Sequence, residues 1–573
     1  MRIAARLSVI ATVVLSSTAF AQGQPTGGEE SVGNVEVKVF ERYEATVRSA
    51  NKLSQQPNYE DTTTKKIEVD YDFSPRIVQT KVELDPIPAA QITTTKIERL
   101  PENMVKLGMG NYTTPEFSLI LANSRSVSTS WSLALDHFST ATGALRDRSV
   151  FNDNYTMNNQ LRAGIVNVNT RWRLKADIDL NLRDISYYGI EKMAGLNETL
   201  TDSDPSRQRY YKYGASARYE RTTNRGNDPF RGIGARYYFL HDRYGASENF
   251  VSAMSDWTIP AGDLDLYLGV GADYLNYAAD STSTSAYAIR FKPHVRKETN
   301  GIYFTVGLNL AFVGSNMTSV EFTQDQAVNK LYFFPDLKAE LPLVRDVLNI
   351  FGGWVGDVDL NGLDVISTLN PYIAPGTLVQ PTGVNKVYLG FSGRISRRFG
   401  YNIQADYNIY SNRALFYRDS ATYFTGFDPY LNVEYADMSV FSPRVELTYH
   451  HPSGIEVSAD ASVFAYGREE EKIAYHLPDF KGGIHAAYTW KEKIVLKTDF
   501  TITGPRIGFG DNEDLEAAQM PTFYDWRLYT EYRYNKFLSA YLSVNNILNQ
   551  DYDLWYGYPA QGTRFILGLA LRF

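Results

Sequence analysis

The sequence contains no cysteine among its 573 residues, and after residue 21 it has no run of about 18 apolar residues. The lack of cysteine agrees with a protein that crosses an oxidising periplasm without using disulfides. The lack of a long apolar run excludes a helix that spans a bilayer. Hydrophobic residues still make up 43% of the chain. If this protein lies in a membrane, strands must therefore carry it across.

Motifs of enzymatic chemistry are also missing. The sequence has no nucleophile motif, no glycine loop for phosphate and no HExxH pair. Its seven histidines show no metal-ligand spacing, and the adjacent His450 and His451 point to opposite faces of a strand. We therefore expect no enzymatic activity and no cofactor, with a lipase-like or protease-like barrel as the alternative.

The amino-terminus has the pattern of a secretory signal. Arg2 and Arg6 precede an apolar stretch, and Ala19 and Ala21 form a small-x-small cleavage site. The signal peptide is expected at 1–21, so that the mature chain begins at Gln22. Removing both arginines shifts the formal charge from -8 to about -10, which argues against a nucleic-acid partner because such partners need a basic surface.

The last residues alternate strictly between two faces. One face carries Phe565, Leu567, Leu569, Leu571 and Phe573, and the other carries Arg564, Ile566, Gly568, Ala570 and Arg572. A period of two predicts a strand with one apolar side. Such a strand at the end of a chain is typical of the closing strand of an outer-membrane barrel. The alternative is an edge strand of a soluble sheet.

The same alternation recurs upstream, for example over 172–183, 264–274 and 538–545. Aromatic residues are abundant, with 41 Tyr, 30 Phe and 7 Trp, as expected where rings line the two lipid-water boundaries. We therefore predict an all-β fold, a transmembrane antiparallel β-barrel over 103–573.

Connections of two kinds alternate along the chain. Tight turns are expected at 260–262, 297–301, 343–346, 397–400, 452–454, 491–493 and 535–536. Longer connections are expected at 187–208, 315–328, 363–384, 413–436, 468–478, 505–522 and 551–561. Since short turns face the periplasm in such barrels, this pattern predicts about 22 strands with both termini periplasmic. Residues 22–102 are expected to form a periplasmic or lumenal extension, partly disordered.

The carboxyl-terminal stretch resembles the end of TonB-dependent receptors. The matching positions are Asn546, Tyr552, Gly557, Pro559, Gly562, Arg564 and Phe573. The resemblance implies a barrel of the cell outer membrane that takes up or binds a substrate there. It also implies contact with outer-membrane lipid, and with the β-barrel assembly machinery during insertion.

The front of the chain departs from that family. Residues 22–102 are too few for a full plug domain, and 35–40 is only faintly similar to a TonB-binding box, so contact with TonB is left open. The stretch 106–115 is similar to plug-poor receptor-like barrels of Bacteroidota-type bacteria. The rival hypothesis is therefore a plugless barrel that serves as a structural or assembly partner of other envelope proteins, such as a surface lipoprotein. A barrel this wide needs a stopper, which would be an inward-folded outer loop, the extension, or a partner protein.

One motif suggests a metal. Asp357, Asp359 and Asn361, followed by Gly362, match the first half of a calcium loop, in which alternate oxygens surround a hard cation. Position twelve of that pattern is Thr368 rather than Glu. A simple Asp/Asn-Gly turn accounts for the motif equally well.

Overall fold

A computed structural model gives the fold. The structure describes residues 103–123, 126–141, 154–189, 207–222, 228–262, 264–299, 301–319, 326–419, 429–468, 474–510 and 519–573. The expected signal peptide, the extension over 22–102 and the segment 35–40 lie outside these residues. Within the described ranges, no helix has the length and apolar character that a membrane crossing would need.

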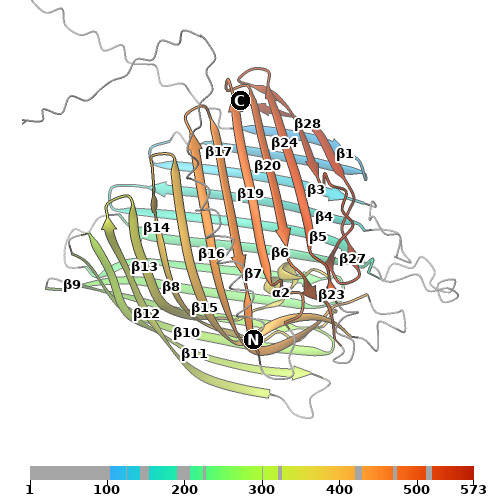
Figure 1. The fold of residues 1–573 in the computed structure, drawn as a ribbon. Helices are drawn as coiled ribbons and strands as arrows, with labels where there is room; N and C mark the ends of the chain where they lie inside the picture. The colour runs from blue at the N-terminus through green and yellow to red at the C-terminus, as the bar shows by residue number, and fades with distance from the viewer. Residues whose placement is uncertain are drawn as a thin grey trace, which may run out of the picture. The chain divides into compact units, whose positions relative to one another are not determined.

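The described chain is a closed antiparallel barrel of 22 strands, which confirms the predicted fold class and strand count (Figure 1). Its strands are β1 (Met104–Gly110), β2 (Thr114–Asn123), β3 (Thr129–Thr140), β4 (Thr156–Val168), β5 (Trp172–Ser186), β6 (Arg207–Arg221), β7 (Phe230–Asp242), β8 (Ser247–Ala261), β9 (Leu264–Ala278), β10 (Thr282–Thr299), β11 (Ile302–Ser319), β12 (Gln326–Val344), β13 (Leu348–Asp359), β14 (Thr382–Arg394), β15 (Phe399–Asp419), β16 (Asn432–His451), the interrupted strand β17 (Ile455–Val463) with β18 (Ala465–Arg468), β19 (Phe480–Trp490), β20 (Ile494–Thr503), β24 (Phe523–Arg533), β25 (Leu538–Asn545) and β28 (Arg564–Arg572). The connections hold helix α2 (Leu363–Leu369) and the short strands β21 (Arg506–Ile507), β22 (Phe509–Gly510), β23 (Gln519–Met520), β26 (Asp553–Trp555) and β27 (Tyr558–Pro559).

The barrel closes where the last strand meets the first. β28 pairs with β1 in antiparallel register, with Leu569 opposite Leu107. At the end of this ladder, Asn103 and Phe573 exchange two backbone hydrogen bonds of 3.0 Å each. Closure removes the free edges that an open sheet would expose to lipid.

The two faces of the wall differ as the alternation predicted. On β28, Leu567 is 63% exposed and Leu569 is 54% exposed, whereas Ile566 and Ala570 are each only 4% exposed. Apolar side chains that remain exposed on the outer face of a closed barrel are the ones that lipid covers. The opposite face turns toward the lumen and carries most of the ion pairs.

The two ends of the barrel also differ. Asn103 and Phe573 lie at one end, which we call the terminal rim; the opposite end is the loop end. Seven hairpins at the terminal rim fall at or beside the predicted tight turns, while the longest connections gather at the loop end. Tight turns that the sequence did not indicate also occur at the loop end, over 111–113, 243–246 and 279–281, so short turns are not confined to the terminal rim.

One seam of the wall is only partly paired. Among the described residues, the ladder between β12 and β13 covers seven residue pairs, from Leu337 with Trp354 to Val344 with Leu348. Residues 326–336 of β12 pair with β11 alone. Pro335, which has no N–H to offer a neighbour, lies in this stretch, as prolines in sheets lie at edges. We call this stretch the seam.

Candidate functional site

The connection from β13 to β14, residues 360–381, folds into the lumen at the loop end, and we call it the lumenal loop. Its bonds reach strands on other parts of the wall. Lys212 on β6 makes a 2.6 Å ion pair with Asp364, and Arg183 on β5 donates a 2.7 Å hydrogen bond to the hydroxyl of Ser367. A loop that starts between β13 and β14 can touch β5 and β6 only by crossing the barrel interior, where Figure 1 draws α2.

Further hydrogen bonds fix the rest of the loop. Thr282 and Thr284 on β10 donate to the carbonyls of Gly376 at 2.7 Å and Val379 at 3.0 Å. Tyr435 on β16 donates to the carbonyl of Leu378 at 3.2 Å. Because backbone groups inside a barrel need partners, these side chains take the place of the water that an exposed loop would bind.

Glu248 on β8 holds the start of α2. Its carboxylate accepts hydrogen bonds from the Leu363 N–H, from the Asp364 N–H at 3.3 Å and from the Tyr238 hydroxyl at 2.8 Å. The first amides of a helix have no partner within the helix, so a carboxylate satisfies them. A Cβ on Gly362 would lie 2.3 Å from Oε2 of Glu248; glycine is therefore required for this approach.

Apolar side chains seal the loop against the wall. Leu363, Ile366, Ile373 and Val379 are at most 4% exposed. They join one cluster with lumen-facing residues of several strands, among them Leu240, Leu275, Ala288, Val313 and Phe334. Burial of this kind stabilises by about 1.5 to 3 kcal/mol for each large aliphatic side chain, so the loop is held by packing as well as by polar bonds.

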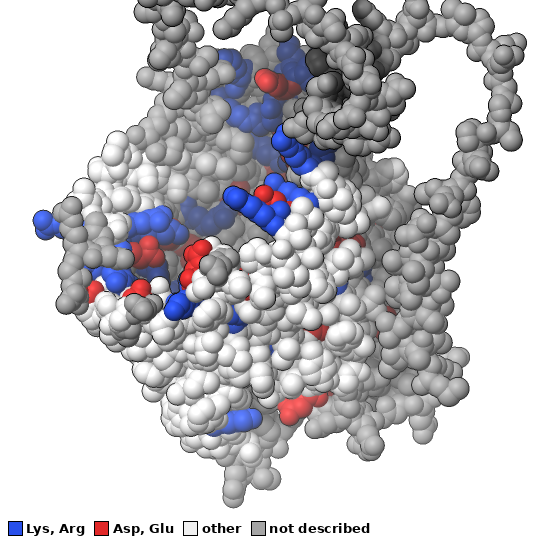
Figure 2. Space-filling view, turned by 60° about the vertical axis from the view of Figure 1, so that its left-hand side comes forward, with Lys and Arg blue, Asp and Glu red and all other residues white. Residues whose placement is uncertain are grey.

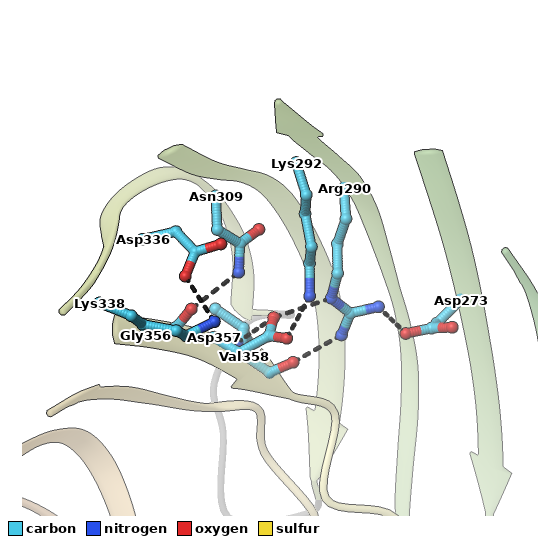
Figure 3. A network of polar contacts seen from close by, with 9 residues as sticks. All are labelled: Asp273, Arg290, Lys292, Asn309, Asp336, Lys338, Gly356, Asp357 and Val358. Atoms are coloured by element: carbon cyan, nitrogen blue, oxygen red, sulfur yellow. Dashed lines mark hydrogen bonds and ion pairs between the residues drawn. The ribbon is translucent and has the colours of Figure 1, made fainter. Parts of the chain in front are cut away.

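A network of polar contacts links β13 to β10 and β11 (Figure 3). Beside the seam, the Gly356 carbonyl accepts a 2.7 Å hydrogen bond from the Asn309 side chain on β11. The Val358 carbonyl accepts a 2.6 Å hydrogen bond from Arg290 on β10. Since buried backbone carbonyls need donors, these two lumenal side chains replace the partners that β12 would otherwise supply.

Carboxylates balance the cations of this network. Arg290 pairs with Asp273 and, at 3.0 Å, with Asp357. Lys292 pairs with Asp357 at 2.6 Å. A small pocket of about 170 Å³ adjoins these side chains. These bonds tie residues 356–358 of β13 to lumenal side chains of β10 and β11. We call Arg290, Lys292 and Asn309, with their bonds to β13, the latch.

Two residues of the possible calcium motif, Asp357 and Asn361, bind different partners. Asp357 is engaged by two cations, as above, and Asn361 donates its amide to the hydroxyl of Thr382. In the part of the chain that the structure describes, no three His, Cys, Asp or Glu side chains are grouped so that they could hold a metal ion. Asp357 already pairs with two cations, and the calcium site stays a prediction.

Six of the seven family-motif residues lie in the final connection, 546–563, or directly after it. We call this connection the C-terminal loop. Asn546, with a φ of 48°, accepts a hydrogen bond from the Gln550 N–H at 3.0 Å and donates to the Gln561 carbonyl at 2.9 Å. Tyr552 stacks on Phe523 with ring centroids 4.2 Å apart. Asn546 and Tyr552 therefore fix the fold of the C-terminal loop.

The remaining motif residues secure its edges. Gly557 has a φ of 81°, and a Cβ there would lie 2.2 Å from Nη1 of Arg418. The Pro559 carbonyl accepts a 3.0 Å hydrogen bond from Tyr188. Gly562 is buried, Arg564 covers the ring of Phe138 at 5.1 Å, and Phe573 ends the chain at the terminal rim.

Three basic side chains clamp the backbone of the C-terminal loop. Arg506 donates to the carbonyls of Asp553 at 2.7 Å and Leu554 at 2.8 Å, and Arg418 donates to the carbonyl of Tyr556 at 3.2 Å. The ring of His476 bonds the Phe416 carbonyl at 2.8 Å and the Tyr556 N–H at 3.0 Å. Burial lowers the pKa of His476 to about 3, so its neutral ring donates to the first group and accepts from the second.

The two loops meet over the lumen. Tyr372 of the lumenal loop stacks on Tyr558 of the C-terminal loop, with centroids 3.8 Å apart.

Sequence patterns did not single out either ring, nor the partners Glu248, Arg290 and Lys292. Glycines within β13, at 352, 353 and 356, are the one local signal, because glycine in a strand marks a close approach.

Charged side chains gather in a hollow of the molecule, with Lys and Arg beside Asp and Glu, while mostly uncharged side chains form the wall around it (Figure 2). Charged side chains on the described strands form ion pairs, as in Lys386 with Asp406 at 3.1 Å and Arg572 with Glu531 at 2.7 Å. The lumen below the loops is thus polar and mixed in sign.

No protein-family model and no curated protein matches the sequence. Solved structures do match in fold. The ferric-catecholate import receptor Fiu from K12 E. coli is 12% identical, with 83% of this chain and 82% of that chain covered at a TM-score of 0.60. The FrpB iron transporter from Neisseria meningitidis is 10% identical, with 83% of this chain and 83% of that chain covered at a TM-score of 0.64. The copper transporter OprC is 11% identical, with 83% of this chain and 81% of that chain covered at a TM-score of 0.59.

These likenesses show that the chain has the barrel fold of TonB-dependent receptors, which confirms the fold that the carboxyl-terminal resemblance implied. The matched proteins are transport receptors rather than enzymes, in agreement with the expectation of a non-enzymatic barrel. The expected missing plug concerns residues outside the described ranges and stays a prediction.

Proposed function

We propose that this protein is a gated uptake barrel of the outer membrane, in which the lumenal loop is the gate and the loop end faces outward. The observation that supports this most is the crossing of the lumen by residues 360–381, held by Lys212, Arg183 and Glu248 on other parts of the wall. Of the stoppers that the sequence suggested, an inward-folded outer loop is the one that the described residues favour. Both chain termini then lie on the periplasmic side.

The lumen favours a small polar substrate, because its wall carries ion pairs and hydrogen-bonding side chains instead of an apolar surface. The names of similar proteins, which include a ferric-catecholate import receptor and a copper transporter, make metal ions and metal chelates the first substrates to test. In this proposal the calcium motif serves the latch through Asp357, and the family-motif residues secure the C-terminal loop beside the gate.

Replacing the loop tests the gate directly. Asp359 and Thr382 are cross-strand partners, so an Asn-Gly turn can join them in place of residues 360–381. In planar bilayers the intact mature chain should conduct little, and the replaced chain should conduct strongly. The control is Leu369→Ala. This residue lies in α2, within the replaced loop, but its side chain is 57% exposed, so the substitution should leave conductance low.

A reversible lock provides a second test. A Cβ on Gly376, whose φ is 71°, would lie 2.8 Å from the hydroxyl oxygen of Ser281, so the two side chains are near enough for the short Cβ-to-Cβ approach of a disulfide. The chain has no other cysteine, so Ser281→Cys with Gly376→Cys should form one defined bond. Oxidised cells should lose uptake of ferric or cupric chelates, and a reducing agent should restore it; the same assay without TonB separates energised from passive entry.

Two outcomes would contradict the proposal. One is uptake that is unaffected by the lock. The other is a loop-replaced barrel that folds, stays non-conducting and co-purifies in fixed ratio with another envelope protein. That second result favours the structural or assembly role.

A further inference from the structure

Three polar side chains near the loop end of β3 and β4 form a hydrogen-bonded chain, which we call the triad. Oγ of Ser139 lies 3.3 Å from Nε2 of His137, and Nδ1 of the same ring lies 2.6 Å from Oδ1 of Asn159. Ser139 follows His137 by two positions on β3, and Asn159 is the residue directly opposite His137 on β4. Strand alternation and register therefore place all three side chains on one face of the wall.

The two hydrogen bonds fix the state of the imidazole. Because the side-chain oxygen of an asparagine can only accept, Nδ1 of His137 carries the proton and donates it to Asn159. Nε2 is then free to accept the hydroxyl proton of Ser139. A serine nucleophile, a histidine base and a third side chain that orients the base are related in this way in acyl-transfer sites. No local motif marks the triad, because Asn159 lies 22 positions after His137.

The triad lies on the outer face of the barrel. Phe138, between His137 and Ser139, turns to the lumen, where Arg564 of β28 covers its ring. Trp131, six positions before His137 and on the same face of β3, is 45% exposed. Since residues an even number of positions apart on a strand share a face, the Ser139 hydroxyl belongs to the outer wall.

The outer face of β3 changes from apolar to polar at the triad. Trp131, Leu133 and Leu135 precede His137 on this face, toward the terminal rim. Lipid covers such an apolar stretch in a membrane barrel. The ester groups of a lipid lie where its acyl chains end and the headgroup region begins. His137 and Ser139 therefore stand at the height of the lipid esters in the leaflet at the loop end.

An apolar pocket of about 150 Å³ adjoins the triad on the same wall, with Asn159 in its lining. The other outward-facing side chains that line it are those of Leu135, Leu161, Leu180, Leu182, Tyr211 and Tyr213. Pockets of aliphatic and aromatic side chains suit the apolar part of a ligand, here an acyl chain. Ser139 itself is 8% exposed, so bulk water is largely kept from its hydroxyl.

We propose that Ser139 and His137 hydrolyse carboxylic esters of lipids in the leaflet at the loop end, an activity beside transport. Nε2 of His137 takes the hydroxyl proton while Oγ of Ser139 attacks the carbonyl carbon of the ester. The bond from that carbon to the alcohol oxygen then breaks. The proton on Nε2 passes to the leaving oxygen, which departs as the lipid alcohol and leaves an acyl group on Ser139.

Water completes the reaction by the same route. It gives one proton to Nε2 of His137 as its oxygen attacks the acyl-serine, and that proton returns to Oγ of Ser139 as the fatty acid leaves. Asn159 is a positioning residue, because it acts on the reaction through the ring that it orients. The proposal takes its membrane placement from the proposed function and is independent of the gate.

Covalent labelling tests the nucleophile in the unmodified chain. A fluorophosphonate probe should react with Ser139 of the purified, folded barrel, with fluoride as the leaving group, and peptide mass spectrometry locates the label. His137→Gln should slow this labelling by about 100- to 10,000-fold, the usual contribution of a general base. Ser255→Ala and His241→Gln alter a serine and a histidine elsewhere on the outer wall and should leave the labelling of Ser139 unchanged. A folded parent that takes no label on Ser139 overturns the proposal.

Lipid hydrolysis is measured in vesicles of phosphatidylethanolamine that contain the mature protein. The parent should release fatty acid and lysolipid in equal amounts, and Ser139→Ala should lose this release. His241→Gln and Ser255→Ala should release both products as the parent does. Equal release from the parent and from Ser139→Ala would mean that another source supplies the activity, which contradicts the proposal.

Two substitutions of Asn159 test its positioning role. Asn159→Ala should lower kcat with KM nearly unchanged, whereas Asn159→Asp, whose carboxylate also accepts from Nδ1, should keep most of the activity. If both lower kcat equally, Asn159 does not orient His137. Heat-modifiable gel mobility shows which variants fold, and the labelling of the parent decides the case where one does not. Conductance after loop replacement is measured separately, so failure of this proposal leaves the gate untouched.

Discussion

The wall between β5 and β6 and the seam between β12 and β13 are built from similar alternating strands, yet one is fully paired and the other is not. β5 and β6 pair along all of Trp172–Ser186. β12 has 19 residues and pairs with β13 over seven positions. At the seam, Asn309 and Arg290 capture the carbonyls of Gly356 and Val358. The difference teaches that lumenal side chains, as well as strand alternation, decide where a barrel wall stays open.

The largest effect is expected on the paired wall. Ile178 on β5 is 53% exposed on the lipid face, and a charge at mid-membrane depth costs about 2 to 4 kcal/mol. Ile178→Arg should therefore fold poorly, while Asn181→Arg, on the lumenal face of the same strand, should fold nearly as the parent does. Urea unfolding followed by heat-modifiable gel mobility measures both; equal stability would show that the faces are assigned wrongly.

The next effect concerns the seam. Arg290→Gln removes bonds to Asp273, Asp357 and the Val358 carbonyl, and should cost about 1 to 3 kcal/mol because buried partners lose their donors. It should also raise conductance, since β13 is no longer held inward. Urea midpoints and planar-bilayer recordings on one preparation test both effects. A destabilised barrel that conducts no more than the parent would break the link between latch and gate.

Acid should act on the C-terminal loop rather than on the paired wall. His476 has a pKa of about 3 in the folded protein and an ordinary value of 6.5, so between these values the unfolded chain binds more protons. The contribution of neutral His476 to the free energy of unfolding is then fully present above about pH 6.5. Below that pH it falls, by up to about 1.4 kcal/mol per pH unit. In His476→Gln the urea midpoint should vary less between pH 7 and 5; an unchanged slope would mean that other groups carry the acid response.

The smallest effect gives the reference for the seam. Arg162 on β4 pairs with Asp136 at 3.2 Å, but both side chains are more than a third exposed, and exposed pairs contribute about 0 to 1 kcal/mol. Arg162→Gln should therefore shift the urea midpoint far less than Arg290→Gln does. If Arg162→Gln and Arg290→Gln lower the urea midpoint equally, the seam is held by something other than its latch.

The sequence allowed the membrane part of the fold to be predicted, because lipid demands an apolar side chain at every second position. The faces of β28 followed from that rule, and the strand count followed from the alternation of tight turns with longer connections. Above the membrane the rule weakens. Connections were expected at 315–328 and 413–436, yet β11 runs to Ser319, β12 starts at Gln326, and β15 runs to Asp419. Strands that project beyond the lipid keep their backbone pairing without the alternation that reveals them.

The candidate site was less accessible to sequence reasoning. Asp357 was singled out for its spacing to Asp359, but its partners Arg290 and Lys292 lie more than 60 positions earlier. Their meeting depends on the register of β10 and on β13 leaving its ladder, neither of which has a local signature. The family-motif residues were found because their turn geometry is local, as the positive φ of Asn546 and Gly557 shows.

The pairing of Asn103 with Phe573 sets the order of assembly. The ladder that joins β1 to β28 cannot form until Phe573 has been synthesised. Before this ladder forms, the free sides of β1 and β28 are open strand edges, each able to pair with another chain. Contacts between residues so far apart in sequence also form slowly. The barrel can therefore close only once the chain has been made as far as β28.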